Sequence, residues 1–180
     1  MLQDIRQKNN EDLKLNKKEG IEPFILFQLA GTNYAIPSTL VQQMEMIESI
    51  TPIPKAPEYV EGVVFSRGEV IPVVNLRVRL GFEKIEYNLK TRLIVINTQG
   101  RTVGLIVDSA RDFILLDHST FQDAPEAIAD SSGKYLNGIV TVGDRLVLVV
   151  NVDAILNFAT DLSQAGTLHE VLEKHQGQKF

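Results

Sequence analysis

The chain has 180 residues, of which 44% are hydrophobic and 23% charged, so it can form one mid-sized domain or two small ones with a continuous core. Its formal net charge of -5 counts against a nucleic-acid binder, because such proteins neutralise phosphates with Lys and Arg. It contains no cysteine, which excludes disulfides and thiolate metal sites and fits a reducing compartment.

Residues 1–22 mix Lys, Glu, Asn and Asp with scattered Leu and Ile, which predicts a mobile N-terminal arm. The arm lacks the apolar core of a signal peptide, and no later apolar run reaches the length of a membrane span. We therefore expect a cytoplasmic protein without direct membrane insertion.

A β-hairpin is predicted directly after the arm. Its strands, 24–30 and 34–36, are rich in aromatic and branched side chains and are separated by a Gly-Thr-Asn turn. Residues 37–40 predict a single helical turn, because Pro fixes φ while Ser and Thr can cap. A strand over 41–47 follows, and three prolines make 51–57 an extended loop.

A second hairpin follows this loop. Strands over 60–65 and 69–74 flank an Arg-Gly pair that suits a tight two-residue turn. Asn75 is expected to cap a short helix that extends to Leu80 and is ended by Gly81.

The second half of the chain begins with another strand pair. Strands are predicted over 91–97 and 102–108, around a Gln-Gly turn, and over 112–116. Residues 117–134 show little periodicity and predict a long loop with one helical turn.

The last hairpin turns at Gly143-Asp144, a stronger turn signal than the Arg-Gly pair of the first half. Asn151 is expected to start a helix that runs through Phe158. A C-terminal tail follows over 161–180, with a candidate helix over 168–174.

One segment of the chain occurs twice. Residues 59–76 match residues 135–152 without a gap, each position recurring 76 residues later. The matched positions include Tyr59 and Tyr135, Gly62 and Gly138, Val73 and Val149, and Asn75 and Asn151. Such a duplication predicts two related β lobes, whose surfaces and seam suit binding more than catalysis.

The sequence offers little for catalysis. His118, His169 and His175 are its only histidines, and Glu173 stands where a zinc-protease motif starting at His169 needs a second His. The glycines of the last hairpin have phosphate-loop spacing but lack the Lys and Ser/Thr that hold phosphate and metal. We expect no enzymatic activity, no catalytic residues, no cofactor and no metal.

Three motifs resemble those of a known family, the CheW chemotaxis coupling proteins. Residues 62–77 are similar to the family pattern Gly-Val-x-Asn-Leu-Arg-Gly-x-x-x-Pro-x-x-Asp-Leu-Arg. Residues 103–108 and 135–139 are similar to its second-lobe signatures, in the expected order and at the expected separations. The resemblance covers about 24–157.

The resemblance implies a mainly β fold of two related five-stranded SH3-like β-barrel lobes packed side by side, with short helices and a C-terminal helix. It assigns residues 23–160 to a CheW-like domain. We expect the lobes to span about 24–88 and 89–152, with an exchange of end strands possible.

The resemblance also implies a function. Members of the family are non-enzymatic adaptors that couple the cytoplasmic tip of chemoreceptors (methyl-accepting chemotaxis proteins) to the regulatory domain of the histidine kinase CheA, in membrane-associated arrays. An alternative is a CheW-like adaptor of a chemotaxis-like pathway for surface motility or another output. A third reading, an enzyme or nucleic-acid module, is disfavoured by the acidic charge and the missing catalytic groups.

Six positions match family positions that contact partners. They are Val41, Gly62, Arg67 and Phe113 for the receptor, in or near the groove between the lobes, and Gly104 and Ala110 for the kinase. The alternatives remain open. The two glycines can simply allow close backbone approach, Val41 and Phe113 can be core residues, and Arg67 can be a solvated turn residue.

The chain departs from the family pattern at three places. Phe65-Ser66 replaces Asn-Leu before the arginine, Asn75 replaces Asp, and Gln43 stands where an acid is common. These departures leave the expected fold unchanged and bear on which receptor is bound.

Overall fold

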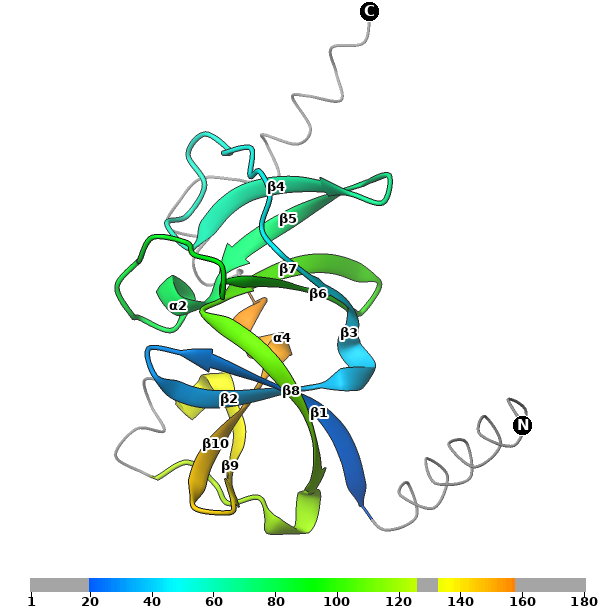
Figure 1. The fold of residues 1–180 in the computed structure, drawn as a ribbon, viewed down its shortest axis with the longest axis vertical. Helices are drawn as coiled ribbons and strands as arrows, with labels where there is room; N and C mark the ends of the chain where they lie inside the picture. The colour runs from blue at the N-terminus through cyan, green and yellow to red at the C-terminus, as the bar shows by residue number, and fades with distance from the viewer. Residues whose placement is uncertain (1–19, 126–132, 158–180) are drawn as a thin grey trace, which may run out of the picture.

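The structure is a computed structural model that describes residues 20–125 and 133–157 (Figure 1). Within these residues the fold is mainly β, as expected, with ten strands in two five-stranded sheets. The first sheet, in spatial order, consists of β8 (Ser109–Asp117), β1 (Ile21–Leu29), β2 (Thr32–Pro37), β10 (Arg145–Val150) and β9 (Leu136–Val142). The second consists of β3 (Val41–Glu45), β6 (Arg92–Thr98), β7 (Arg101–Val107), β5 (Glu69–Asn75) and β4 (Val60–Ser66).

Short helical turns connect the strands. They are η1 (Ser38–Leu40), α2 (Leu76–Arg79), η2 (His118–Thr120), η3 (Gly133–Tyr135) and α4 (Val152–Ile155). The predicted hairpins, the turn at η1, the strand that follows it and the capped helix α2 are confirmed. The first hairpin turns at Ala30 and Gly31 and not over 31–33, because Thr32 already pairs with Leu29. The predicted strand 112–116 is longer, because β8 begins at Ser109, shortly after β7, and pairs with residues 21–28 of β1.

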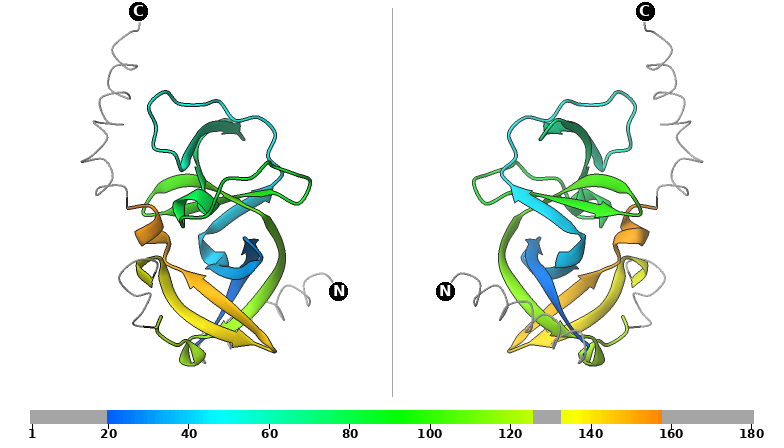
Figure 2. Two further views of the ribbon diagram at one scale, coloured as in Figure 1. Left: turned by 90° about the vertical axis from the view of Figure 1, so that its left-hand side faces the viewer. Right: turned by 90° about the vertical axis from the view of Figure 1, so that its right-hand side faces the viewer.

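The duplication in the sequence is a duplication in the structure. In β4–β5, Gly62 pairs with Val73 beside a bulge, and in β9–β10 Gly138 pairs with Val149 beside a bulge. The amide of Asn75 donates to the carbonyl of Tyr59, and the equivalent bond from Asn151 to Tyr135 has the same length, 2.7 Å. The two hairpins lie at opposite ends of the molecule (Figures 1 and 2).

The two sheets do not follow the expected division at residues 88 and 89. The hairpin β1–β2 joins β8, β9 and β10 from the second half of the chain, whereas β6–β7 joins β3, β4 and β5 from the first half. The strands β3 and β8 cross from one lobe to the other, as the path of β8 in Figure 1 shows. The structure therefore corrects the contiguous lobes to two interlocked repeats, and the exchange involves whole hairpins.

Each sheet curls toward a barrel, and its open side is bridged at one point. Thr51 exchanges two backbone hydrogen bonds of 2.8 and 2.9 Å with Val63 on the edge strand β4. Gln122 does the same with Ile139 on β9, with lengths of 2.9 and 2.8 Å. Since Val63 and Ile139 are equivalent in the repeat, both lobes are closed by the same device.

The core of the described residues has three parts. The central cluster combines Phe27 and Ile36 of one sheet with Ile94 and Leu105 of the other, and with Ile155 of α4. A smaller cluster lies inside each lobe. Because the largest cluster is shared, burial of apolar surface holds the two lobes together as one unit.

Three predicted boundaries need comment. Ile21 and Glu22, placed in the arm by the sequence, belong to β1, because they pair with the end of β8. The helix after Asn151 ends at Ile155 rather than Phe158, and Leu156 is its C-cap. Most of the arm, the C-terminal tail and the helix expected over 168–174 lie outside the described residues.

Candidate functional site

The tip of the β4–β5 hairpin projects an arginine. Arg67 and Gly68 both have positive φ, 49° and 87°, which gives the turn the twist that two-residue hairpins require. A positive φ is uncommon for a residue with a side chain, and such conformations gather at functional sites. The side chain of Arg67 is exposed, as the sequence predicted.

An apolar pair lies directly behind Arg67. Phe65 and Val70 face each other across the two strands and are 76% and 65% exposed. Large apolar side chains that are exposed next to each other usually mark a surface that contacts another protein. The sequence identified Phe65 only as a departure from the family pattern.

Arg67 lies between two hollows that it shares with Ser66. One, of about 300 Å³, is also lined by Met46, Phe65 and the acids Glu45 and Glu48. The other, of about 550 Å³, is lined mainly by polar side chains. The polar residues that line this larger hollow are Gln42, Gln43, Ser66, Arg67, Glu69, Asn97 and Thr102.

Gln43 and Ser66 join the two edges of the second sheet. They belong to β3 and β4, which are the outermost strands, and the Gln43 amide donates to the Ser66 hydroxyl at 3.0 Å. This half-buried bond lies one residue before Arg67 and anchors the base of the turn. Two of the departures from the family pattern are therefore partners of each other.

Gly62 is buried in β4 beside the bridge to Thr51. A Cβ at this position would lie 2.0 Å from the Thr51 carbonyl oxygen, and the φ of 142° is one that other residues avoid. The structural alternative left open by the sequence, close backbone approach, is what the geometry shows.

Gly104 and Ala110, the expected kinase positions, are both buried. Gly104 lies in one row of the sheet with Val73 and Gly62, since Val73 pairs with both glycines. A Cβ on Gly104 would meet only the Leu93 side chain, at 2.7 Å. Ala110, 6% exposed, packs in the central core opposite Phe27. Because both residues are buried, a substitution at either one can affect a partner only through the packing around it.

Val41 and Phe113 lie on the two strands that cross between the lobes. Val41 opens β3 and packs, half-buried, against the central core. Phe113 on β8 is 60% exposed and pairs with Ile25, which packs against the same core. Phe113 is therefore not a core residue, whereas Val41 is in part.

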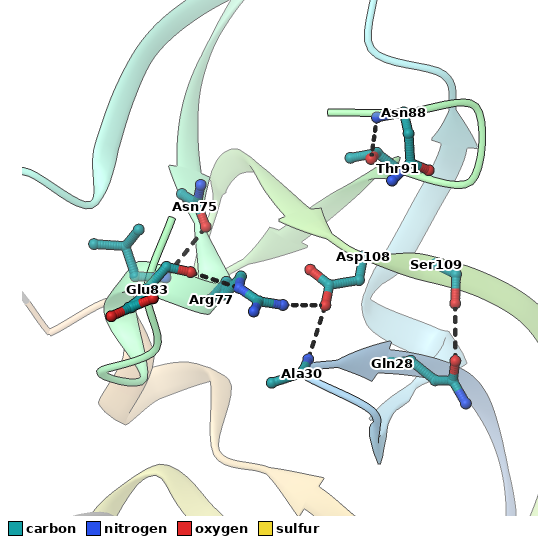
Figure 3. A network of polar contacts seen from close by, with 10 residues as sticks. Gln28, Ala30, Asn75, Arg77, Glu83, Asn88, Thr91, Asp108 and Ser109 are labelled. Atoms are coloured by element: carbon teal, nitrogen blue, oxygen red, sulfur yellow. Dashed lines mark hydrogen bonds and ion pairs between the residues drawn. The ribbon is translucent and has the colours of Figure 1, made fainter. Parts of the chain in front are cut away.

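Asp108 ties the crossing point of β7 and β8 to both lobes (Figure 3). Its carboxylate accepts from the amide of Ala30, in the β1–β2 turn, at 2.8 Å and forms an ion pair with Arg77 of α2 at 2.5 Å. Arg77 also donates to the carbonyl of Glu83. These bonds hold the β1–β2 turn of one lobe and α2 of the other against the point where β8 crosses between the lobes.

Arg79 of α2 joins the lobes on the other side of the seam. Its guanidinium lies over the rings of Tyr59 and Tyr135, at 4.5 and 5.3 Å from their centroids, and donates to the Ile155 carbonyl of α4 at 2.9 Å. The two tyrosines are equivalent in the repeat, so one cation contacts the same residue of both copies.

A polar cluster holds the connection after α2. Asn75 donates to Glu61 at 2.9 Å and caps α2 by accepting from the Val78 amide, while Lys84 pairs with Glu61 at 2.7 Å. Burial raises the pKa of Glu61, but hydrogen bonds from Lys84, Asn75 and Tyr87 outweigh it and lower the pKa. The pKa of Tyr87 is raised by burial and by this contact with Glu61.

Within residues 20–125 and 133–157, no group of three or more His, Cys, Asp or Glu is arranged to hold a metal ion. In the same part of the chain, no helix has the length and apolar character needed to cross a membrane.

Comparisons with known proteins agree with the fold. The chain is 35% identical over 136 residues to the chemotaxis protein CheW of Bacillus subtilis (strain 168), covering 76% of this chain and 87% of that protein. It is 27% identical over 146 residues to the protein FrzA of Myxococcus xanthus, covering 80% and 87%. The crystal structure of the scaffolding protein TtCheW from Thermoanaerobacter tengcongensis superposes with a TM-score of 0.68 at 28% identity, covering 76% of this chain and 86% of that one.

A family model adds the extent of the match. The model of the CheW-like domain fits residues 23–160, which include the described strands β2 to β10 and most of β1. With its interlocked five-stranded sheets and the motif over 62–77 that contains the hairpin tip at Arg67, the chain belongs to the CheW-like domain family.

Proposed function

We propose that the chain is a non-enzymatic adaptor that couples chemoreceptors to a CheA-type histidine kinase. The observation that carries this proposal is the β4–β5 tip, where Arg67 projects beside the exposed Phe65 and Val70 on a scaffold of the CheW-like family. A rigid lobe with an exposed apolar and cationic tip suits binding to another protein. The adaptor would act in the cytoplasm, recruited to receptor arrays at the membrane.

The receptor tip would contact Arg67, Val41 and Phe113. Arg67 supplies a cation with several donors, and Phe113 supplies an exposed apolar surface on a crossing strand. Gly62 supports this site from within, because it lets the Thr51 bridge close the lobe behind the hairpin.

The regulatory domain of the kinase would bind elsewhere, at a surface supported by Gly104 and Ala110. Since both residues are buried, they would contribute by setting the positions of the strands β7 and β8. Binding of two partners at once requires separate surfaces, and the interlocked lobes offer them.

The test is a reconstitution from purified parts. The chain is mixed with CheA and with cytoplasmic fragments of the chemoreceptors encoded in the same genome, and kinase autophosphorylation is measured. The proposal expects receptor-dependent kinase control only when the chain is present, and no turnover by the chain alone. Receptor control without the chain, or a chain that binds neither partner, would contradict it.

A second candidate is an adaptor of a chemotaxis-like pathway with another output such as surface motility, and it is kept because one relative, FrzA of Myxococcus xanthus, does not carry the name of a chemotaxis protein. The same reconstitution separates the two when each CheA-type kinase of the genome is tested in turn. Coupling to a kinase that does not control swimming would support the second candidate.

A further inference from the structure

We infer that Gln43 is a specificity-determining residue of the receptor site, because its neutral side chain leaves the Arg67 guanidinium available for an acidic group of the receptor. The inference rests on the proposed function of Arg67 as a receptor contact and adds the chemistry of what it contacts. Gln43 acts through its position beside Arg67 and its lack of charge, because its amide is already bonded to Ser66.

The geometry places residue 43 within the surroundings of Arg67. The side chains of Gln43, Ser66 and Arg67 line the same hollow of about 550 Å³. The Gln43 amide is held there by its 3.0 Å bond to Ser66, the direct neighbour of Arg67. The side chain at position 43 therefore lies beside the turn, in a hollow that Arg67 also lines.

The charge of Arg67 is not used inside the described part of the chain. No ion pair or hydrogen bond of its guanidinium occurs there, although Glu69 lines the same hollow and Glu45 and Glu48 line the adjacent one. A carboxylate fixed at position 43 would supply an internal partner for this cation. Because Gln43 is an amide, it does not compete with an acid of another protein for the Arg67 guanidinium.

The smaller hollow, of about 300 Å³, indicates which other side chain the partner carries. Phe65 and Met46, 76% and 51% exposed, line it beside Arg67. A receptor segment that fits both hollows carries an acidic side chain for Arg67 next to an apolar side chain for Phe65. The glutamates that line this hollow, Glu45 and Glu48, disfavour a second acid there.

The experiment is a double-mutant cycle. The full chain and the variants Gln43→Glu, Arg67→Ala and the double variant are titrated with the cytoplasmic receptor fragment bound by the wild-type chain. We expect Gln43→Glu to weaken binding about tenfold, and to have little further effect when Arg67 is already Ala. Raising the salt concentration should shrink the effect of Gln43→Glu, because the competition is electrostatic.

Three controls separate charge from structure. Gln122→Glu adds the same charge to the other lobe and should leave receptor binding unchanged. Gln43→Met removes the hydrogen bond to Ser66 without adding charge and should weaken binding less than about threefold. The melting temperature and the titration with the CheA regulatory domain should remain at wild-type values for Gln43→Glu.

The outcomes are distinct. Equal losses from Gln43→Glu with and without Arg67, or an equal loss from Gln122→Glu or Gln43→Met, would overturn the inference while leaving the adaptor intact. Receptor binding by Gln43→Glu at wild-type strength would overturn it as well. A wild-type chain that binds no receptor fragment would instead overturn the proposed function, and the inference with it.

Discussion

Two glycines in one row of the second sheet show how differently the same residue can be constrained. Gly62 faces backbone atoms of Thr51 and has a φ of 142°, whereas Gly104 faces the side chain of Leu93. Backbone that is held by a bridge cannot move aside, but a leucine can change its rotamer. The cost of an added methyl group should follow this difference.

We expect Gly62→Ala to destabilise the protein by about 3 kcal/mol or more, because it combines a backbone clash with a strained φ. Gly104→Ala should cost only about 1–2 kcal/mol, the usual range for modest overpacking. Urea unfolding of both variants measures the difference. Equal losses at the two positions would show that the Thr51 bridge is not rigid.

Arg67 should matter for binding and not for stability. Arg67→Ala removes an exposed side chain, so the free energy of unfolding should change by less than about 0.5 kcal/mol. Receptor affinity should fall about thirtyfold, the loss of about 2 kcal/mol typical of an interface anchor, and Arg67→Glu should be worse.

Melting curves and separate titrations with receptor and kinase fragments decide this prediction. Phe113→Ala serves as a second receptor-site variant, and Leu146→Ala, at the equivalent tip of β9–β10, as a matched control. Equal loss of both partners from Arg67→Ala would show that the assignment to the receptor is wrong.

At the scale of elements, the two short helices α2 and α4 begin with equivalent asparagine caps, which differ in the other hydrogen bonds that they form. The side chain of Asn75 accepts from Val78, and that of Asn151 accepts from Ala154. Asn75 also donates to Glu61, whereas position 137, equivalent to Glu61, is an Asn that bonds a backbone carbonyl.

Asn151→Ala should therefore cost about 1 kcal/mol, the usual value of an N-cap. Asn75→Ala should cost at least about 2 kcal/mol, because it also removes one of the hydrogen bonds donated to the half-buried Glu61 carboxylate. Thermal unfolding of the pair tests this, and a smaller loss at Asn75 than at Asn151 would contradict it.

The cluster around Glu61 should make the second sheet sensitive to acid. The pKa of Glu61 is lowered from its ordinary value of 4.5, so its contribution is fully present above that value and is lost as the pH falls through the folded-state pKa. We expect Glu61→Gln to lower stability at neutral pH and to reduce the loss of stability on acidification. Lys84→Gln, which removes one of the bonds that lower the pKa, should give an intermediate slope. Urea midpoints between about pH 6 and pH 3 measure this, and an unchanged slope in Glu61→Gln would contradict it.

The sequence predicted most elements because their signals are local. Local signals decide the conformation of the residues next to them. Examples are the hairpin turns, the helix caps at Asn75 and Asn151, and the prolines of the 51–57 loop. The Gln43–Ser66 bond joins residues 23 positions apart and depends on the curl of a whole sheet. No local pattern in the chain encodes that curl, so the partnership appears only in the structure.

At the scale of the whole molecule, the repeat was visible in the sequence but its interlocking was not. Periodicity shows that Tyr59 and Tyr135 are equivalent, yet it does not say which hairpin completes which sheet. The interlocked arrangement is held by the crossing strands and by contacts between elements far apart in sequence, such as those of Asp108 with Ala30 and Arg77. For the same reason the site could be located at Arg67 from motif and turn, but its surroundings could not.

The interlocking predicts that the lobes cannot fold apart. Each five-stranded sheet takes a hairpin from one half of the chain and three strands from the other, and the largest core cluster is shared. Fragments 1–87 and 88–180 should each lack cooperative unfolding as monomers, and should recover the native circular dichroism spectrum when mixed. A single urea transition for the intact chain is expected as well. A fragment that unfolds cooperatively as a monomer would contradict this.

The exchange of hairpins between the lobes is symmetric, because each repeat gives its first hairpin to the sheet of the other. A polypeptide with one repeat could form the same two sheets by trading hairpins with a second copy, so the present fold has the topology of a domain-swapped homodimer joined into one chain. In a true homodimer both tips would carry the same residues. A single chain is free of that constraint, and its tips differ, with Arg67 on one and Gly143 at the matching place on the other. The one-chain arrangement thus allows a small, internally duplicated molecule to carry two tips of different chemistry.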